Sequence, residues 1–188
     1  MPLIRRISTD SALESAAVVF SLAFTLLYLR GVVPGCYAAA FFGSLLFAIL
    51  CWRKHIFAES ALHVFYVGMA IYGVLVTDAN WKVVSWPASD HLPWLIAGSI
   101  GTAVAGYLLN RNPLAETAYL DAFTTVFSLI ATWLMIAYVH ENWLYWIVID
   151  SAAVALYALR RLYLGAALFL LYTAMAIDGY FRQISWFS

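Results

Sequence analysis

The sequence predicts an all-α integral membrane protein with seven transmembrane helices, and two observations lead to this fold class. Of the 188 residues, 65% are hydrophobic and 11% are charged, whereas a soluble domain usually carries about 25% charged residues. The apolar residues also gather in seven runs, each of about the 17–25 residues that a helix needs to cross a bilayer. The runs nearly exhaust the chain, so we expect a single transmembrane domain over residues 1–188 and no soluble module.

The first run follows Arg5 and Arg6, as the hydrophobic part of a signal peptide would, but it is long and no small-residue cleavage pattern follows it. We therefore expect it to be retained as a helix. The longest connection runs from Thr77 to His91 and mixes charged residues with a proline and two tryptophans, which is typical of an interfacial loop. In chain order, the seven predicted helices are Ala12–Leu29, Val33–Trp52, Phe57–Val76, Leu92–Leu109, Ala118–Tyr138, Trp143–Leu159 and Tyr163–Phe181.

The positive charges predict the orientation of these helices. With seven spans, the N-terminus and every second loop lie on the same side of the membrane. The positive-inside rule makes the more basic side cytoplasmic, which predicts a cytoplasmic N-terminus and a C-terminus on the outer side. The side of the N-terminus carries seven of the ten lysines and arginines, namely Arg5, Arg6, Arg53, Lys54, Arg111, Arg160 and Arg161.

Several functional classes lack the residues that they need. The net charge is zero, so there is no basic surface for nucleic acid. Cys36 and Cys51 share one run and supply too few ligands for a metal. His63 is the only histidine within a run, where we expect it to form a hydrogen bond between helices. No GxSxG, HExxH or GxxxxGKS/T motif occurs, and the seventh run has no lysine for a retinal Schiff base, so we expect neither an enzyme nor a bound cofactor.

An internal repeat divides the chain. The segment Ala61–Gly73 aligns without gaps to Ala167–Gly179, with seven identities in thirteen positions and an offset of 106 residues. The offset implies two three-helix units, over residues 12–76 and 118–181, with the helix at residues 92–109 as a linker. Because both units begin on the same side of the membrane, we expect them to be parallel, as in SWEET-type sugar transporters, with a substrate path between them.

One face of the sixth predicted helix combines an acid with two tryptophans. Trp143, Trp146 and Asp150 are spaced i, i+3 and i+7, so their side chains point the same way. The predicted orientation places Asp150 roughly 10 Å into the bilayer, where a carboxylate indicates either a cation site or a hydrogen bond between helices. Trp146 is the better candidate to stack on a cation, whereas Trp143 also fits the interfacial aromatic belt. At the equivalent positions the first unit has Tyr37, Ala40 and Ser44.

Three tyrosines complete the set of candidate site residues. Tyr66 and Tyr172 are repeat partners in the middle of their helices, and Tyr157 lies two turns beyond Asp150 on the same face. A phenol hydroxyl needs a polar partner inside a membrane, so lining a substrate path and bonding between helices both fit these residues. The predicted substrate-binding residues are therefore Trp143, Trp146, Asp150, Tyr66, Tyr157 and Tyr172.

Five segments are characteristic of a known family: LRG after the first run, AESALHVFYVGMAIYG, YLDAFTTVFSLIATWL, ENWLYWIVID and ALYALRRLYLGAALFLLY. With them, the chain resembles the PnuC family of bacterial vitamin transporters over nearly its whole length. The most specific feature is the family pattern WxxWxxxN/D, present here as Trp143, Trp146 and Asp150. The resemblance implies facilitated uptake of nicotinamide riboside or a closely related cationic vitamin across the bacterial inner membrane. It also implies a homotrimer in the lipid bilayer and a cytoplasmic kinase that draws uptake forward by phosphorylating the substrate.

Asp150 leaves the choice of substrate open. Within the family, nicotinamide riboside transporters tend to have asparagine at the end of this pattern, whereas thiamine transporters can carry an acid. Both vitamins contain a permanently cationic aromatic ring, which suits tryptophan faces and a carboxylate. The alternatives are therefore a thiamine transporter of the same family, a proton-coupled transporter in which Asp150 titrates, and a seven-helix sensor that binds a small ligand without moving it.

Overall fold

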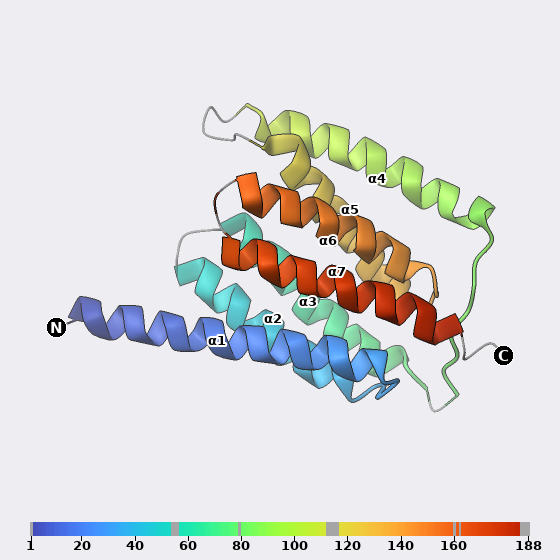
Figure 1. Cartoon of the computed structure of the whole chain (residues 1–188), viewed down its shortest axis with the longest axis horizontal. Coiled ribbons are helices and arrows are strands. Elements are labelled where there is room, and N and C mark those ends of the chain that lie inside the picture. The colour runs from blue at the N-terminus through green and yellow to red at the C-terminus, as the bar shows by residue number, and fades with distance from the viewer. Residues whose placement is uncertain are drawn as a thin grey trace. The chain divides into compact units, whose positions relative to one another are not determined.

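The computed structural model describes residues 2–53, 57–78, 80–111, 117–159, 161 and 163–184. Apart from one isolated β-bridge, the regular elements in these ranges are α-helices (Figure 1). All seven predicted helices are confirmed. In chain order they are α1 (Pro2–Leu29), α2 (Cys36–Arg53), α3 (Phe57–Val76), α4 (Ala88–Leu109), α5 (Ala118–Ile136), α6 (Asn142–Leu159) and α7 (Tyr163–Ile184).

Some helices extend beyond the predicted runs: α1 begins at Pro2 rather than Ala12, and α4 begins at Ala88, so the predicted loop to His91 is shorter. Two other helix ends differ because the backbone turns sharply. The second predicted run begins at Val33, but α2 begins at Cys36, because a turn with Gly31 at φ 67° precedes it. The fifth predicted run extends to Tyr138, but α5 ends at Ile136 and Tyr138 adopts φ 56°. A positive φ does not fit a right-handed helix. Turn geometry rather than hydropathy therefore sets both boundaries.

Residues Met1–Trp81 form one compact unit. Within it, α1 packs against α2, and α2 packs against α3. The hydroxyl of Ser60 in α3 donates a hydrogen bond of 2.9 Å to the carbonyl of Ala48 in α2. Arg53 in α2 forms an ion pair of 2.9 Å with Asp10 in α1. Polar contacts thus join α2 to both of its neighbours.

Residues Lys82–Ser188 form a second compact unit, in which α4 packs against α5, α5 against α6 and α6 against α7. Gly98 lets α4 approach α5 closely, because an added Cβ would lie 2.6 Å from the Phe127 ring. The predicted linker helix is thus a packing partner of α5, while the predicted three-plus-one-plus-three arrangement stays a prediction. The buried core cluster of this unit consists of Phe127, Ile130, Ala131, Leu134, Val139 and Ile149.

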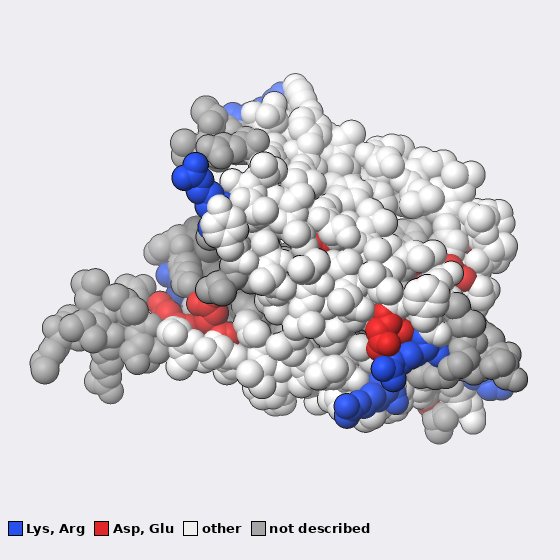
Figure 2. Space-filling model, viewed as in Figure 1, with Lys and Arg blue, Asp and Glu red and all other residues white. Residues whose placement is uncertain are grey.

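Helices α1 to α6 are long and apolar enough, over their described residues, to cross a membrane. Helix α7 has 22 residues, but some of its side chains lie outside the described part of the chain, and it is not among these six. Large apolar side chains such as Val19 and Leu75 point outward. Figure 2 shows that charged side chains gather mainly near the helix ends and that most of the surface between them is uncharged. This distribution is typical of helices surrounded by lipid.

The internal repeat is visible in the structure of each unit. The bounds of α2 and α6 differ at both ends by 106 residues, which is the offset of the sequence repeat. Tyr37 lies on Gly73 in the first unit, where an added Cβ would be 2.8 Å from the ring. Trp143 lies on Gly179 in the second unit, where the corresponding distance is 2.7 Å. In both units, therefore, an aromatic residue at the start of the middle helix packs on a glycine near the end of the last helix.

Candidate functional site

Asp150 lies in the middle of α6 and is 5% exposed. Within the described part of the chain, its carboxyl group has no hydrogen bond or ion pair. It interacts electrostatically with the phenol of Tyr172, which is on the neighbouring helix α7. A buried carboxylate without a fixed partner lacks the hydrogen bonds or the cation that would compensate for its lost hydration. Its surroundings therefore favour a ligand site over a structural hydrogen bond between helices.

A row of aromatic rings continues from this pair along α6 and α7. The Phe169 ring lies 6.1 Å from the ring of Tyr172 and 4.9 Å from that of Tyr157. Tyr157 is held against the start of α7, because an added Cβ at Gly165 would lie 2.1 Å from its ring. The structure thus brings three of the predicted site residues, Asp150, Tyr157 and Tyr172, into one row. Phe169 was not predicted, and its only signal in the sequence is its alignment with His63 in the repeat.

The two tryptophans of the predicted face have different surroundings. Trp143 is 3% exposed, and its indole covers the backbone of α7 at Gly179. Trp146 is partly buried and packs against the core cluster of the second unit. Its indole N–H is buried and has no hydrogen-bond partner within the described residues. Trp146 therefore keeps a donor for a ligand, while the face of Trp143 is already in use for helix packing.

Tyr66 belongs to the first unit, on α3, and lies among other rings. Its ring is 5.7 Å from that of His63 and 5.8 Å from that of Phe65. His63 in turn stacks on Phe47 of α2, with ring centroids 4.9 Å apart and an interplanar angle of 18°. The Nδ1 atom of His63 has no hydrogen-bond partner among the described residues. The predicted hydrogen bond between helices is thus not formed by Nδ1 of His63 among the described residues. The imidazole instead stacks on the Phe47 ring of the neighbouring helix α2.

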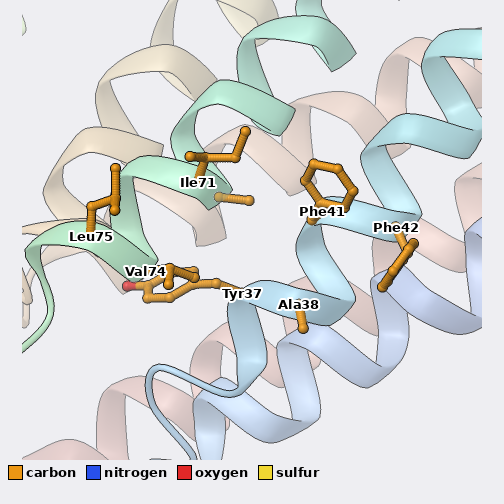
Figure 3. A pocket seen from close by; sticks show the side chains of 8 residues that line it. Tyr37, Ala38, Phe41, Phe42, Ile71, Val74 and Leu75 are labelled. Atoms are coloured by element: carbon orange, nitrogen blue, oxygen red, sulfur yellow. The ribbon is translucent and has the colours of Figure 1, made fainter.

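A pocket of about 260 Å³ lies on the first unit between α2 and α3. Figure 3 shows how Tyr37 and Phe41 from α2 and Ile71 from α3 contribute to its wall. Its lining carries no charged side chain and includes none of the six predicted site residues. The pocket therefore suits an apolar chain rather than a cationic vitamin.

The model of the nicotinamide mononucleotide transporter family matches residues 11–187. The chain belongs to this family. Similar proteins include the nicotinamide riboside transporter PnuC of Escherichia coli K12 and that of Shigella flexneri. Each is 26% identical, and each match covers 74% of this chain and 72% of the relative. A crystal structure described as the vitamin B3 transporter PnuC is 21% identical, with a TM-score of 0.75 over 98% of this chain and 85% of that one.

As a member of the nicotinamide mononucleotide transporter family, the protein is a multi-pass membrane transporter. The resemblance to PnuC that the five sequence segments indicate is confirmed. The likeness to the solved structure confirms the helical fold. These comparisons support a transporter rather than a sensor, and they give no support to the thiamine alternative.

Proposed function

We propose that the protein is a facilitator that carries nicotinamide riboside across the bacterial inner membrane. The observation that supports this most directly is the buried carboxylate of Asp150, which has no hydrogen-bond partner among the described residues and interacts electrostatically with Tyr172. The pyridinium ring of nicotinamide riboside carries a permanent positive charge, which would compensate this carboxylate. The names of the bacterial relatives point to the same substrate.

The residues of this site would have distinct roles. Asp150 meets the charge of the ring, and Trp146 stacks on it or donates its free indole N–H to an oxygen of the substrate. Tyr172 supplies a hydroxyl next to Asp150. Tyr157 and Phe169 extend the aromatic wall toward the start of α7. Tyr66 would be contributed by the first unit, and Trp143 would support the site by holding α6 on α7.

The predicted membrane arrangement belongs to the same proposal. Two parallel three-helix units with α4 as linker would rock about the substrate path and release the vitamin inward. The N-terminus would be cytoplasmic and the C-terminus periplasmic. Several copies of the chain would assemble in the bilayer, as a homotrimer. A cytoplasmic kinase would then trap the vitamin by adding a phosphate group.

Uptake into liposomes that contain the purified protein tests this function. Labelled nicotinamide riboside should enter until its concentration is equal on both sides, and an excess of unlabelled nicotinamide riboside should compete better than thiamine or riboflavin. A facilitator's initial rate should not change when the proton gradient is collapsed. Binding without entry would instead indicate a sensor, a preference for thiamine would reject the proposed substrate, and a rate that follows the gradient would indicate proton coupling.

A further inference from the structure

A polar cluster at the beginning of α6 is separate from the row at Asp150. The carboxylate of Glu141, the residue before α6, accepts a hydrogen bond of 2.5 Å from the Ser85 hydroxyl and one of 3.0 Å from the backbone N–H of Trp86. It also lies 3.8 Å from Nε2 of His91 in α4. One carboxylate therefore joins the connection before α4, the first turn of α4 and the start of α6.

The connection before α4 is also held by its backbone. The N–H of Val84 donates to the carbonyl of Tyr138 at 2.9 Å, and the N–H of His140 donates to the carbonyl of Val84 at 2.8 Å. These two bonds form the parallel β-bridge between Val84 and Val139. We call Val84, Ser85 and Trp86 the strap. The bridge sets the position of the strap on the turn between α5 and α6, and Glu141 holds the Ser85 hydroxyl and the Trp86 backbone N–H there.

Aromatic side chains connect this cluster to Trp146 of the proposed substrate site. We call the predicted face of α6 with Trp146 and Asp150 the substrate face. Nδ1 of His91 lies 3.1 Å from the hydroxyl of Tyr145, the neighbour of Trp146 in α6. Trp86 of the strap and Trp146 of the proposed site both pack against the same core cluster of the second unit. A displacement of the strap would therefore change the packing around Trp146, because closely packed side chains do not leave room for independent movement.

The first unit provides an internal comparison. At the offset of 106 residues, Glu141 aligns with Gly35 and Tyr145 aligns with Ala39, neither of which can form such a cluster. The same unit also lacks the acid of the substrate face, because Asp150 aligns with Ser44. The packing of the middle helix on a glycine occurs in both units, so this packing does not require the cluster. Only the unit with the substrate face contains the cluster as well.

We propose that Glu141 is a positioning residue for transport, which holds the strap on the start of α6 and thereby sets the orientation of Trp146 toward the substrate. This inference rests on the proposed function of Trp146 but concerns residues outside the substrate face. Glu141 itself does not contact the vitamin. Removal of its charge should weaken substrate recognition more than it slows the conformational cycle.

The test compares Glu141→Gln with Asp178→Asn in liposomes that contain the full chain. Asp178 lies in the same unit, on the exposed side of α7, and forms an ion pair of 2.6 Å with Arg182. Asp178→Asn is the matched control, because it also removes the charge of one carboxylate. We expect Glu141→Gln to raise the KM for nicotinamide riboside by roughly threefold or more, since residues of one hydrogen-bond network are commonly coupled to this extent. The maximal rate should change less than the KM, and Asp178→Asn should leave both unchanged.

A second measurement does not depend on the identity of the substrate. In protein labelled with 5-fluorotryptophan, the ¹⁹F resonance of Trp146 is identified by its loss in Trp146→Phe. It should shift in Glu141→Gln, and to a smaller extent in Ser85→Ala, but not in Asp178→Asn. An unmoved resonance in a folded Glu141→Gln protein, or a KM equal to that of the unmodified chain, would overturn the inference. If the unmodified chain does not transport nicotinamide riboside, the proposed function fails, but the resonance still decides the role of Glu141.

Discussion

The indole of Trp143 lies directly on Gly179, so that α6 and α7 touch where α7 has no side chain. The same relationship joins Tyr37 to Gly73 in the first unit, with 3% and 1% of the two aromatic residues exposed. Because the first unit has no acid at the position of Asp150, this packing serves the three-helix unit itself. It gives Trp143 a structural role within the sequence pattern, because its ring face is covered by α7, whereas Trp146 packs against the core cluster of the second unit.

Replacement of either glycine should destabilise the protein. Gly179→Ala places a Cβ 2.7 Å from the Trp143 ring, and overpacking of this kind costs about 1–3 kcal/mol. Gly73→Ala should have a similar effect through Tyr37. The measurement is the apparent melting temperature of purified protein in detergent. Gly68→Ala is the control, because an added Cβ there meets nothing within 4 Å; a similar loss in all three variants would contradict the packing argument.

The two tryptophans should respond differently to substitution. Trp143→Tyr introduces the residue that packs on Gly73 in the first unit, and we expect a folded protein that retains nicotinamide riboside uptake. Trp146→Ala removes the indole N–H and should reduce uptake by roughly tenfold, which corresponds to about 1.4 kcal/mol of binding free energy. Uptake rates and melting temperatures of both variants decide the issue. Greater loss of uptake in Trp143→Tyr than in Trp146→Ala would reverse the assigned roles.

Asp150 and Tyr172 should act as a coupled pair. Asp150→Ala removes the carboxylate that would meet the positively charged ring, and binding of nicotinamide riboside should weaken roughly tenfold or more, since two unit charges about 4 Å apart attract each other by about 4 kcal/mol near a protein surface. Tyr172→Phe should have a smaller effect. In the double variant the two losses should not add, because the groups interact. Calorimetric titration of all three variants measures the coupling, and simple additivity would show that the two residues act independently.

The contribution of Glu141 to stability should depend on pH. Burial by itself would raise the pKa of the Glu141 carboxyl, but hydrogen bonds from Ser85, from the Trp86 backbone and from its own backbone N–H, and the nearby His140, lower it below the ordinary 4.5. A pKa that is lower in the folded state stabilises the fold above pH 4.5, and this contribution is lost as the pH falls through the folded-state value. The difference in melting temperature between the unmodified chain and Glu141→Gln should therefore be largest near neutral pH and shrink below about pH 4.5. A difference that grows in acid would contradict this sign.

Hydropathy alone predicted the seven helices, and for α3 it predicted both ends, Phe57 and Val76. A long apolar run has few alternatives to a helix in lipid, because its backbone groups must bond to one another there. The repeat offset also followed from the sequence and recurs in the bounds of α2 and α6. The family followed from short segments, above all from Trp143, Trp146 and Asp150, because these residue types at this spacing are specific.

Only the tertiary structure decided which side chains are used for packing and which remain free. The sequence placed Trp143 and Trp146 on one helical face. Gly179, which contacts Trp143, lies 36 residues further along the chain, so this contact depends on how α7 packs against α6. Glu141 and Ser85 are 56 residues apart and meet because a backbone bridge aligns the strap with the turn before α6. Helical periodicity describes neighbours within about two turns, whereas contacts between helices depend on the close packing of the whole unit. The sequence therefore determined the spans, the repeat and the family. The packed structure decided that Trp143 lies on Gly179, that Phe169 lies beside Tyr157 and Tyr172, and that Glu141 bonds to the strap.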